Sequence, residues 1–349
     1  LADFVRSQKA TSMGGSDLSD YLQANSSAHY RIKFEEVVLL EFLLVARKLG
    51  VKKETAVAIP TDSKVVYEFL KTLPFEWTQA QKKVFQEIAH DIAQPHPMYR
   101  LVQGDVGSGK TLVAFASCLL LAKAGFQSCL MAPTEILAEQ HFKNAQKFLE
   151  PMGVRLGMLT GRQTASEKKD QLEKLKNFSV DLVIGTHALI EEGVLFANLG
   201  LVIIDEQHRF GVHQRAGLKQ KGHSPHFLVM TATPIPRTLA MTVYGDLDIS
   251  IIDELPKGRT PIQTRVIFEN KRIQALQFMK EQIQAGRQAY VIYPLVEESE
   301  KMDLKNAVDE AQSLQEYFPE FKVGLLHGKM KSQEKDQVME AFRRNEIQI

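Results

Sequence analysis

Residues 104–111, Gly104-Asp105-Val106-Gly107-Ser108-Gly109-Lys110-Thr111, decide the fold of this chain. A glycine, four residues and then Gly-Lys-Thr form the pattern of a phosphate-binding loop, whose backbone N–H groups turn inward onto a polyphosphate. Glycines supply the dihedral angles that such a turn requires. We expect Lys110 to neutralise charge on the β- and γ-phosphates and the Thr111 hydroxyl to coordinate Mg²⁺. The whole stretch is therefore predicted to bind a nucleotide.

The segments on either side of the loop have the character that the pattern requires. Residues 99–103 indicate a strand, and residues 112–123 indicate a mostly buried helix that ends before Gly125. The start of that helix adds a favourable dipole at the anion. The alternative, a glycine-rich turn with a chance lysine, is disfavoured by these flanks.

Composition sets the broad class. The 349 residues leave room for two or three domains, and 44% hydrophobic with 24% charged residues is typical of a globular protein. The net charge of +1 favours no particular partner, so a nucleic-acid surface must be local. Cys118 and Cys129 match no metal or redox spacing and are predicted to be small buried hydrophobes, as in a reducing cytoplasm. The longest apolar run, residues 37–46, is too short to span a membrane, and we expect no membrane association.

Strand–helix alternation from residue 100 onward predicts an α/β fold with a parallel sheet and helices on both faces. Residues 73–256 are assigned to this first domain. Residues 1–72 are predicted to form an arm and a linking helix. That helix, residues 31–49, is apolar almost all round, so we expect it to be buried against another element. The predicted strands of the first domain are residues 100–103, 127–132, 154–159, 181–185, 200–204 and 226–230.

A second alternating block occupies residues 257–349. Its predicted strands lie near residues 263–268, 288–293 and 322–326, and its predicted helices near 270–285, 304–317 and 331–344. The chain stops at Ile347-Gln348-Ile349, which has the character of the start of another strand. The sequence therefore predicts tandem parallel-sheet lobes, of which the second is incomplete.

Two adjacent carboxylates, Asp205 and Glu206, follow the apolar strand at residues 201–204. Ligands in parallel sheets bind at the carboxyl ends of strands, so both should face the nucleotide. We expect Asp205 to join Thr111 in holding Mg²⁺, and Glu206 to orient and deprotonate the attacking water. The alternative is an ordinary solvated turn, which the phosphate-binding loop disfavours.

The residues that follow narrow the class to helicase-type motors. An Asp-Glu-x-His block ends at His208, and Thr231-Ala232-Thr233 follows another apolar strand. We expect His208 to hydrogen-bond both threonine hydroxyls, and so to link hydrolysis to a strand end that moves. The alternative is a polar surface histidine; a P-loop kinase needs neither feature.

Gln81 is a weaker candidate. Thr78 is a plausible N-cap for a helix over residues 79–91, and Gln81 lies in its first turn. With an upstream aromatic residue, Gln81 has the chemistry to pair with an adenine edge. A surface glutamine near a helix cap explains the same residue equally well.

Taken together, these motifs resemble the RecG family of ATP-dependent DNA helicases in helicase superfamily 2. The nearest rival family, the transcription-repair coupling factors, shares the text of residues 231–239, whereas Ser108, Gln207 and residues 253–256 favour RecG. The resemblance covers residues 31–349. The matching segments are residues 97–111, 132–141, 185–189, 205–212, 231–239, 244–248, 286–290 and 325–328.

The resemblance implies two RecA-like lobes that use ATP and Mg²⁺ to remodel branched double-stranded DNA, such as stalled forks and Holliday junctions, in repair and recombination. It also implies that Gln81 reads adenine. Short hydroxyls and backbone N–H groups at strand ends bond phosphates without reading bases. The implied DNA contacts are Pro133, Thr134, Thr160, Gly161, Thr186 and His187, with Arg155 and Arg162 as further candidates for phosphate contacts.

Two departures from the family pattern matter. Most of the N-terminal wedge domain has no counterpart here, and the part of the second lobe that carries the family's arginine fingers has none before Ile349. We therefore expect a truncated motor core, monomeric and cytoplasmic. The alternative for such a truncated form is a nucleotide-gated DNA-binding module without turnover.

Overall fold

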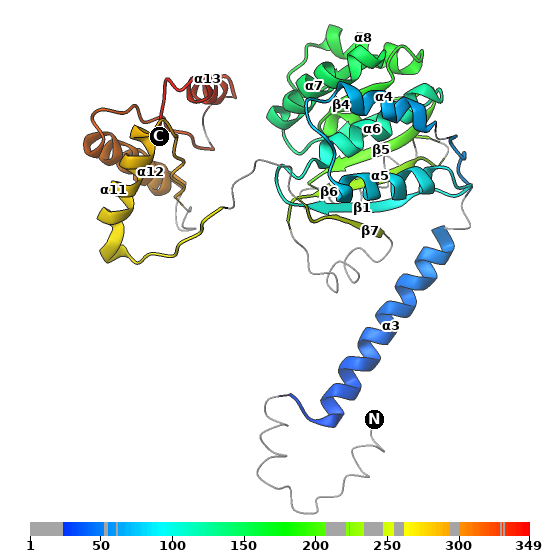
Figure 1. Cartoon of the computed structure of the whole chain (residues 1–349), viewed down its shortest axis with the longest axis horizontal. Helices are drawn as coiled ribbons and strands as arrows, with labels where there is room; N and C mark the ends of the chain where they lie inside the picture. The colour runs from blue at the N-terminus through cyan, green and yellow to red at the C-terminus, as the bar shows by residue number, and fades with distance from the viewer. Residues whose placement is uncertain are drawn as a thin grey trace, which may run out of the picture. The chain divides into compact units, whose positions relative to one another are not determined.

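The computed structural model describes residues 24–51, 55–60, 62–206, 221–222, 224–233, 247–254, 262–293, 300–328, 330 and 332–349 (Figure 1). The chain divides into two compact units, residues 1–259 and 260–349. This division lies close to the predicted boundary at residue 256. The separation of residues 1–72 as a region of its own stays a prediction.

The first unit is built on a seven-stranded sheet in which every neighbouring pair is parallel. The predicted α/β class with a parallel sheet is confirmed. Along the sheet the strands follow the order β3-β4-β2-β5-β6-β1-β7. Their bounds are β1 Tyr99–Gly104, β2 Gln127–Met131, β3 Leu156–Leu159, β4 Leu182–Gly185, β5 Leu199–Asp205, β6 His226–Thr231 and β7 Asp248–Ile252.

Helices cover the sheet (Figure 1), and the side chains of the central strands β2, β4 and β5 alternate between two cores. In β5, Leu201 and Ile203 pack in one core, together with the helices that follow β1 and β2. Val202 and Ile204 pack in the other. The helices of this unit are α4 Ser63–Thr72, α5 Gln79–Ile92, α6 Lys110–Lys123, α7 Glu135–Leu149 and α8 Ala165–Lys176, with short 3₁₀ turns η1 Glu150–Met152 and η2 His187–Ile190.

The predicted role of the two cysteines as buried hydrophobes is confirmed. Cys118 on α6 and Cys129 on β2 are both free and buried. Burial raises the pKa of each thiol to about 12, so neither is a thiolate at neutral pH.

The strand β7 was not predicted from the sequence. It lies at the edge of the sheet beside β1, and its burial alternates, with Ser250 and Ile252 buried and Ile251 exposed. An edge strand of five residues with a serine at a buried position lacks the continuous apolar run that marked the central strands.

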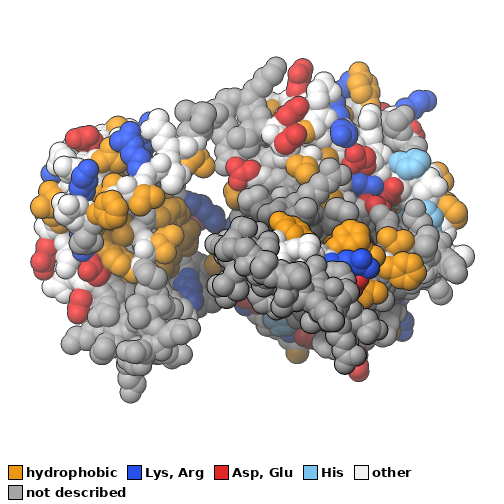
Figure 2. Space-filling view, turned by 90° about the horizontal axis from the view of Figure 1, so that it is seen from below, with side chains coloured by type: hydrophobic (Ala, Val, Ile, Leu, Met, Phe, Trp, Pro, Cys, Tyr) orange, Lys and Arg blue, Asp and Glu red, His pale blue; other side chains and the backbone are white. Residues whose placement is uncertain are grey.

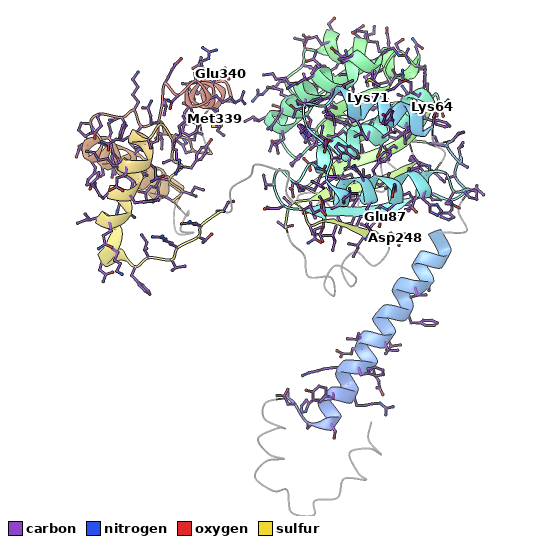
Figure 3. The ribbon with its side chains drawn as sticks, viewed as in Figure 1. Lys64, Lys71, Glu87, Asp248, Met339 and Glu340 are labelled. Atoms are coloured by element: carbon purple, nitrogen blue, oxygen red, sulfur yellow. The ribbon has the colours of Figure 1, made fainter. Side chains whose placement is uncertain are left out.

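A buried ion-pair network joins this edge strand to the rest of the unit. Arg100 of β1 is 8% exposed; its Nη2 lies 2.7 Å from Asp91 Oδ2 and its Nη1 lies 3.2 Å from Glu87 Oε2. The same Nη1 donates to Ser250 Oγ at 2.6 Å, and that hydroxyl donates to Glu87. Figure 3 shows Glu87 on α5 close to β7, whose first residue, Asp248, is also labelled. One guanidinium thus links β1, α5 and β7.

Replacing Arg100 by methionine should lower the free energy of unfolding by about 3–5 kcal/mol, because two half-buried carboxylates then lack their cation. Urea denaturation followed by circular dichroism measures this. The matched control is Lys174→Met on α8, which breaks an exposed pair with Asp170 and should cost less than about 1 kcal/mol. Equal losses in the two variants would contradict a structural role for the network.

The predicted N-terminal helix forms as α3 Ser27–Val51, but its predicted burial is wrong. Tyr30, Phe34, Leu39 and Phe42 are each more than 60% exposed. An apolar helix surface requires a covering partner, and none covers these four side chains within the described residues. No helix in the described part of the chain is long and apolar enough to cross a membrane.

The second unit holds α11 Arg272–Gln284, α12 Glu300–Tyr317 and α13 Ser332–Arg343, preceded by a 3₁₀ turn, η4 Glu269–Lys271. These three helices match the predicted ones. A small core brings together side chains of α11, of α12 and of the extended segments that follow the helices. Figure 2 shows many hydrophobic side chains (orange) at the surface of this unit, on the left of the view. That core is formed by Ile283, Leu314, Phe318 and Ile349.

The predicted strands near residues 263–268, 288–293 and 322–326 are not formed as strands in the described residues. Two of these segments form backbone hydrogen bonds with the last residues of the sequence. Ala289 N donates to Gln348 O at 2.9 Å, and Gly324 N donates to Ile349 O at 2.8 Å. Residues 347–349 therefore lie between two extended segments and form backbone hydrogen bonds with both.

Candidate nucleotide and nucleic-acid site

The strand order brings the predicted nucleotide-binding residues to one edge of the sheet. β5, β6 and β1 are neighbours, and because they are parallel their carboxyl ends lie side by side. The phosphate-binding loop, residues 104–111, follows β1. Asp205 ends β5, and Thr231-Ala232-Thr233 lies at the end of β6. Three motifs that are far apart in sequence thus face one place.

The loop has the backbone geometry of a phosphate cradle. Gly107 and Gly109 have φ angles of 78° and 89°, in the left-handed region that favours glycine. A Cβ on Gly104 would meet Ser108 Oγ at 2.6 Å, so the loop closes tightly over the end of β1. Gly109 is also the N-cap of α6, which directs the start of that helix at the loop.

Lys110 lies inside this cradle. Its side chain is buried, and Nζ donates to Gly104 O at 2.7 Å and to Asp105 O at 3.0 Å. Burial lowers the pKa of Lys110, while the charges of Glu206, Asp205 and Asp105 act in the opposite direction. The Lys110 ammonium therefore forms hydrogen bonds with the carbonyls of its own loop and interacts electrostatically with three carboxylates.

Gln81 lies at a helix cap, as the alternative proposed, but it is buried and not on the surface. It is 1% exposed and forms a capping box with Thr78 at the start of α5: Gln81 Oε1 accepts from Thr78 N at 2.9 Å, and Gln81 N donates to Thr78 Oγ1 at 3.2 Å. Gln81 Nε2 donates to Ser108 O at 2.7 Å. The amide thus ties α5 to the phosphate-binding loop, and adenine reading by this residue stays a prediction.

Gly109→Ala should weaken nucleotide binding by about tenfold or more, because the new Cβ would lie 2.1 Å from Gln81 Nε2 and must displace it from the loop. Gly125→Ala is the matched control, since Gly125 has a φ of 81° but nothing within 4 Å of its Cβ position. Both variants carry the backbone strain of about 1–2 kcal/mol. Titration with a fluorescent ATP analogue compares them; an equal loss of affinity would show that strain alone is responsible.

Glu206 makes a connection that the sequence analysis missed. Its φ of 54° places it in the left-handed region, and its Oε1 accepts from Ala232 N at 3.0 Å. Thr231 Oγ1 lies 3.4 Å from Glu206 Oε2 and 2.8 Å from Thr233 Oγ1. The predicted coupling partner, His208, lies outside the described residues. The observed link from the acidic pair to the end of β6 runs through Glu206.

Asp205 has a partner that was also missed. His141 Nε2, on α7, lies 2.7 Å from Asp205 Oδ2. His141 belongs to the buried face of its helix with Ala138 and Ala145. A histidine in line with buried alanines was the available signal, because a polar side chain on an apolar helix face requires a partner.

The residues present suit a Mg²⁺ ion bound together with a nucleotide. Thr111 is the second residue of α6, directly after Lys110, and Asp205 is half-buried at the neighbouring strand end. A hydroxyl and a carboxylate are hard oxygen donors of the kind that Mg²⁺ accepts, with phosphates and waters completing its shell. Within the described residues, no group of three or more His, Cys, Asp or Glu side chains is placed to hold a metal ion.

The other half of the same edge carries the predicted DNA contacts. Residues 160–161 follow β3, residues 186–187 follow β4 and residues 133–134 follow β2, and these three strands are neighbours in the sheet. Gly161 and His187 are exposed, and Pro133 is half-buried. Thr160 and Thr186 are 4% and 2% exposed, so their side chains face the interior.

Three further residues of this half are engaged within the protein. Thr134 Oγ1 caps α7 by accepting from Leu137 N at 3.3 Å. Arg155 pairs with Asp181 at 2.6 Å, and Arg162 pairs with Glu135 at 2.5 Å. A phosphate contact by either arginine would compete with these ion pairs.

Comparison with known proteins agrees with the motifs. Residues 78–242 match the family described as DEAD/DEAH box helicase. The chain is 48% identical to the ATP-dependent DNA helicase RecG of Aquifex aeolicus, over 90% of this chain and 40% of that protein. It is also 48% identical to the RecG of Streptococcus pneumoniae, over 94% of this chain and 49% of that protein.

A solved structure of RecG bound to a three-way DNA junction resembles 92% of this chain, with a TM-score of 0.77 and 40% sequence identity, and the match covers 42% of that chain. The predicted resemblance to the RecG helicases is confirmed, and the parallel sheet matches their RecA-like fold. The chain spans less than half the length of these three relatives.

Proposed function

We propose that this chain is the ATP-driven motor portion of a RecG-type DNA helicase that remodels branched double-stranded DNA in repair and recombination. The observation that carries the proposal is the meeting of the phosphate-binding loop, Asp205-Glu206 and Thr231-Ala232-Thr233 at neighbouring strand ends. The similarity to RecG helicases over 90% of the chain supports it.

In this mechanism, the chain's own residues bind ATP and prepare the attack of water. Lys110 exchanges the carbonyls of Gly104 and Asp105 for the β- and γ-phosphates. Glu206 orients the water and accepts its proton. Asp205 and Thr111 would hold a Mg²⁺ ion, which would supply charge neutralisation at the transferred phosphoryl group.

The same geometry suggests how ATP hydrolysis at Glu206 changes the structure at the neighbouring strand ends of the sheet. Glu206 accepts a hydrogen bond from Ala232 N at the end of β6. When the Glu206 carboxylate takes up the proton of the attacking water, it loses its negative charge, and this hydrogen bond changes in strength. We infer that this link transmits hydrolysis to the strand ends. His208 is proposed to take part with the Thr231 and Thr233 hydroxyls.

DNA is proposed to bind along the half of the edge formed by β3, β4 and β2. The exposed Gly161 and His187, together with Pro133 and Thr134, offer backbone and short polar groups. Such groups contact phosphates without reading bases, so binding should be indifferent to sequence and sensitive to salt. The solved structure of a RecG bound to a three-way junction supports branched DNA as the substrate. We also propose that the protein is monomeric and acts in the cytoplasm.

Phosphate release separates this proposal from a DNA-binding module without turnover. We expect a three-way junction to raise the rate of phosphate release by the 1–349 chain above the rates with a linear duplex and without DNA. Lys110→Ala supplies the background. Release that never exceeds this background, together with nucleotide-dependent junction binding in fluorescence anisotropy, would favour the binding module instead.

A further inference from the structure

His141 is held in one orientation inside the first unit. Its side chain is 8% exposed and that of Asp205 is 13% exposed, with Nε2 and Oδ2 2.7 Å apart. A carboxylate oxygen only accepts hydrogen bonds, so His141 Nε2 carries the proton and donates it. His141 Nδ1 is buried and has no hydrogen-bond partner among the described residues. With a proton on Nε2 and none on Nδ1, the ring has no unpaired N–H group.

This hydrogen bond joins the helix α7 to the end of the strand β5. The helix α7 follows β2 and begins directly after Pro133-Thr134, in the half of the edge that is proposed to face DNA. Asp205 ends β5, in the half that is proposed to hold the nucleotide. β2 and β5 are neighbours, so the bond from His141 to Asp205 crosses from one half to the other.

We propose that His141 is a positioning residue for Asp205, which fixes the carboxylate so that Oδ1 is presented to the Mg²⁺ of a bound nucleotide. This inference rests on the proposed function and adds a residue to it. Removing a residue that forms a hydrogen bond to a metal ligand, and so orients it, typically lowers the affinity for the metal by about 10–100-fold. His141 has the geometry for that role, because it forms a hydrogen bond with Oδ2 of Asp205 and leaves Oδ1 to serve as the metal ligand.

The choice of variants follows from the contact. His141→Leu removes the donor and leaves Asp205 Oδ2 without its partner. His141→Gln can place an amide N–H near the position of Nε2 and should keep the carboxylate oriented. Ala145→Gly is the matched control, because Ala145 lies one turn further along the same buried face of α7 and its replacement weakens the helix without touching Asp205.

The measurement is the affinity of a fluorescent, non-hydrolysable ATP analogue for the full 1–349 chain, with Mg²⁺ and with EDTA, beside thermal unfolding of each variant. We expect His141→Leu to lose about 10-fold or more of the affinity gained from Mg²⁺. Its affinity in EDTA should match that of the wild type. His141→Gln should keep most of the gain, and Ala145→Gly should keep all of it even where its melting temperature falls.

The possible results are distinguishable. A full Mg²⁺ gain in His141→Leu, an equal loss with and without Mg²⁺, or the same loss in Ala145→Gly would overturn the positioning role and leave the proposed function intact. A wild-type chain that binds the analogue no better with Mg²⁺ than with EDTA would overturn the proposed metal site, and this inference with it.

Discussion

Replacing Lys110 by alanine should reduce ATP turnover by about 10²–10³-fold, since an enzyme that loses one preorganised charge donor at a developing phosphate charge typically loses that much. The fold should survive the change. The Lys110 ammonium donates to two carbonyls of its own loop, and Lys110 is not a member of the hydrophobic core cluster around α6. Steady-state phosphate release and thermal unfolding measure the two effects.

The matched control for this variant is Lys123→Ala. Lys123 lies in the last turn of the same helix, α6, and its Nζ donates to Met152 O at 2.8 Å at the surface. Turnover by this control should equal that of the wild type. Unchanged turnover in Lys110→Ala would remove the phosphate-binding loop from the mechanism, whereas a collapse of its melting temperature would assign Lys110 a structural role instead.

Glu206→Gln should lose about 10²–10⁴-fold in turnover while keeping its affinity for Mg·ATP, because an amide cannot accept the proton of the attacking water. The amide oxygen can still accept from Ala232 N, so the local structure should hold. Asp205→Asn should behave differently: it should weaken Mg²⁺-dependent binding of the nucleotide. Titration of a non-hydrolysable analogue and single-turnover hydrolysis separate binding from chemistry.

Glu167→Gln serves as the control for both carboxylate variants. Glu167 forms a capping box at the exposed start of α8 and should affect neither binding nor turnover. If Glu206→Gln and Asp205→Asn lost the same affinity, the division of roles between the two carboxylates would be wrong.

Much of the first unit could be predicted because its signals are local. Each of the central strands is a short apolar run that ends in small or polar residues, and the phosphate-binding loop is a contiguous pattern. The helix that starts after Thr78 is marked by its own capping residues. Such features need no knowledge of what packs against them.

The rest depends on contacts between distant residues. His141 and Asp205 are 64 positions apart and meet only because β2 and β5 pair. Gln81 was ambiguous because its burial depends on the loop 27 positions further along the chain. The edge strand β7 pairs with β1 through backbone groups that any sequence offers, so its short alternating pattern carries little information.

The apolar character of α3 and of the extended segments in residues 262–293 was read correctly, but its consequence was not. An apolar side chain is buried only where another element of the protein packs against it. Phe42 and Ile292 are 72% and 87% exposed in the described structure.

A crystal structure of the 1–349 chain with Mg²⁺ and a non-hydrolysable ATP analogue tests the central claim most directly. We predict that the β- and γ-phosphates lie within residues 104–111, that Lys110 Nζ has left the carbonyls of Gly104 and Asp105 for phosphate oxygens, and that the metal lies between Thr111 and Asp205. A nucleotide bound away from the carboxyl ends of β1 and β5, or one bound there with Lys110 still on its own loop, would contradict it.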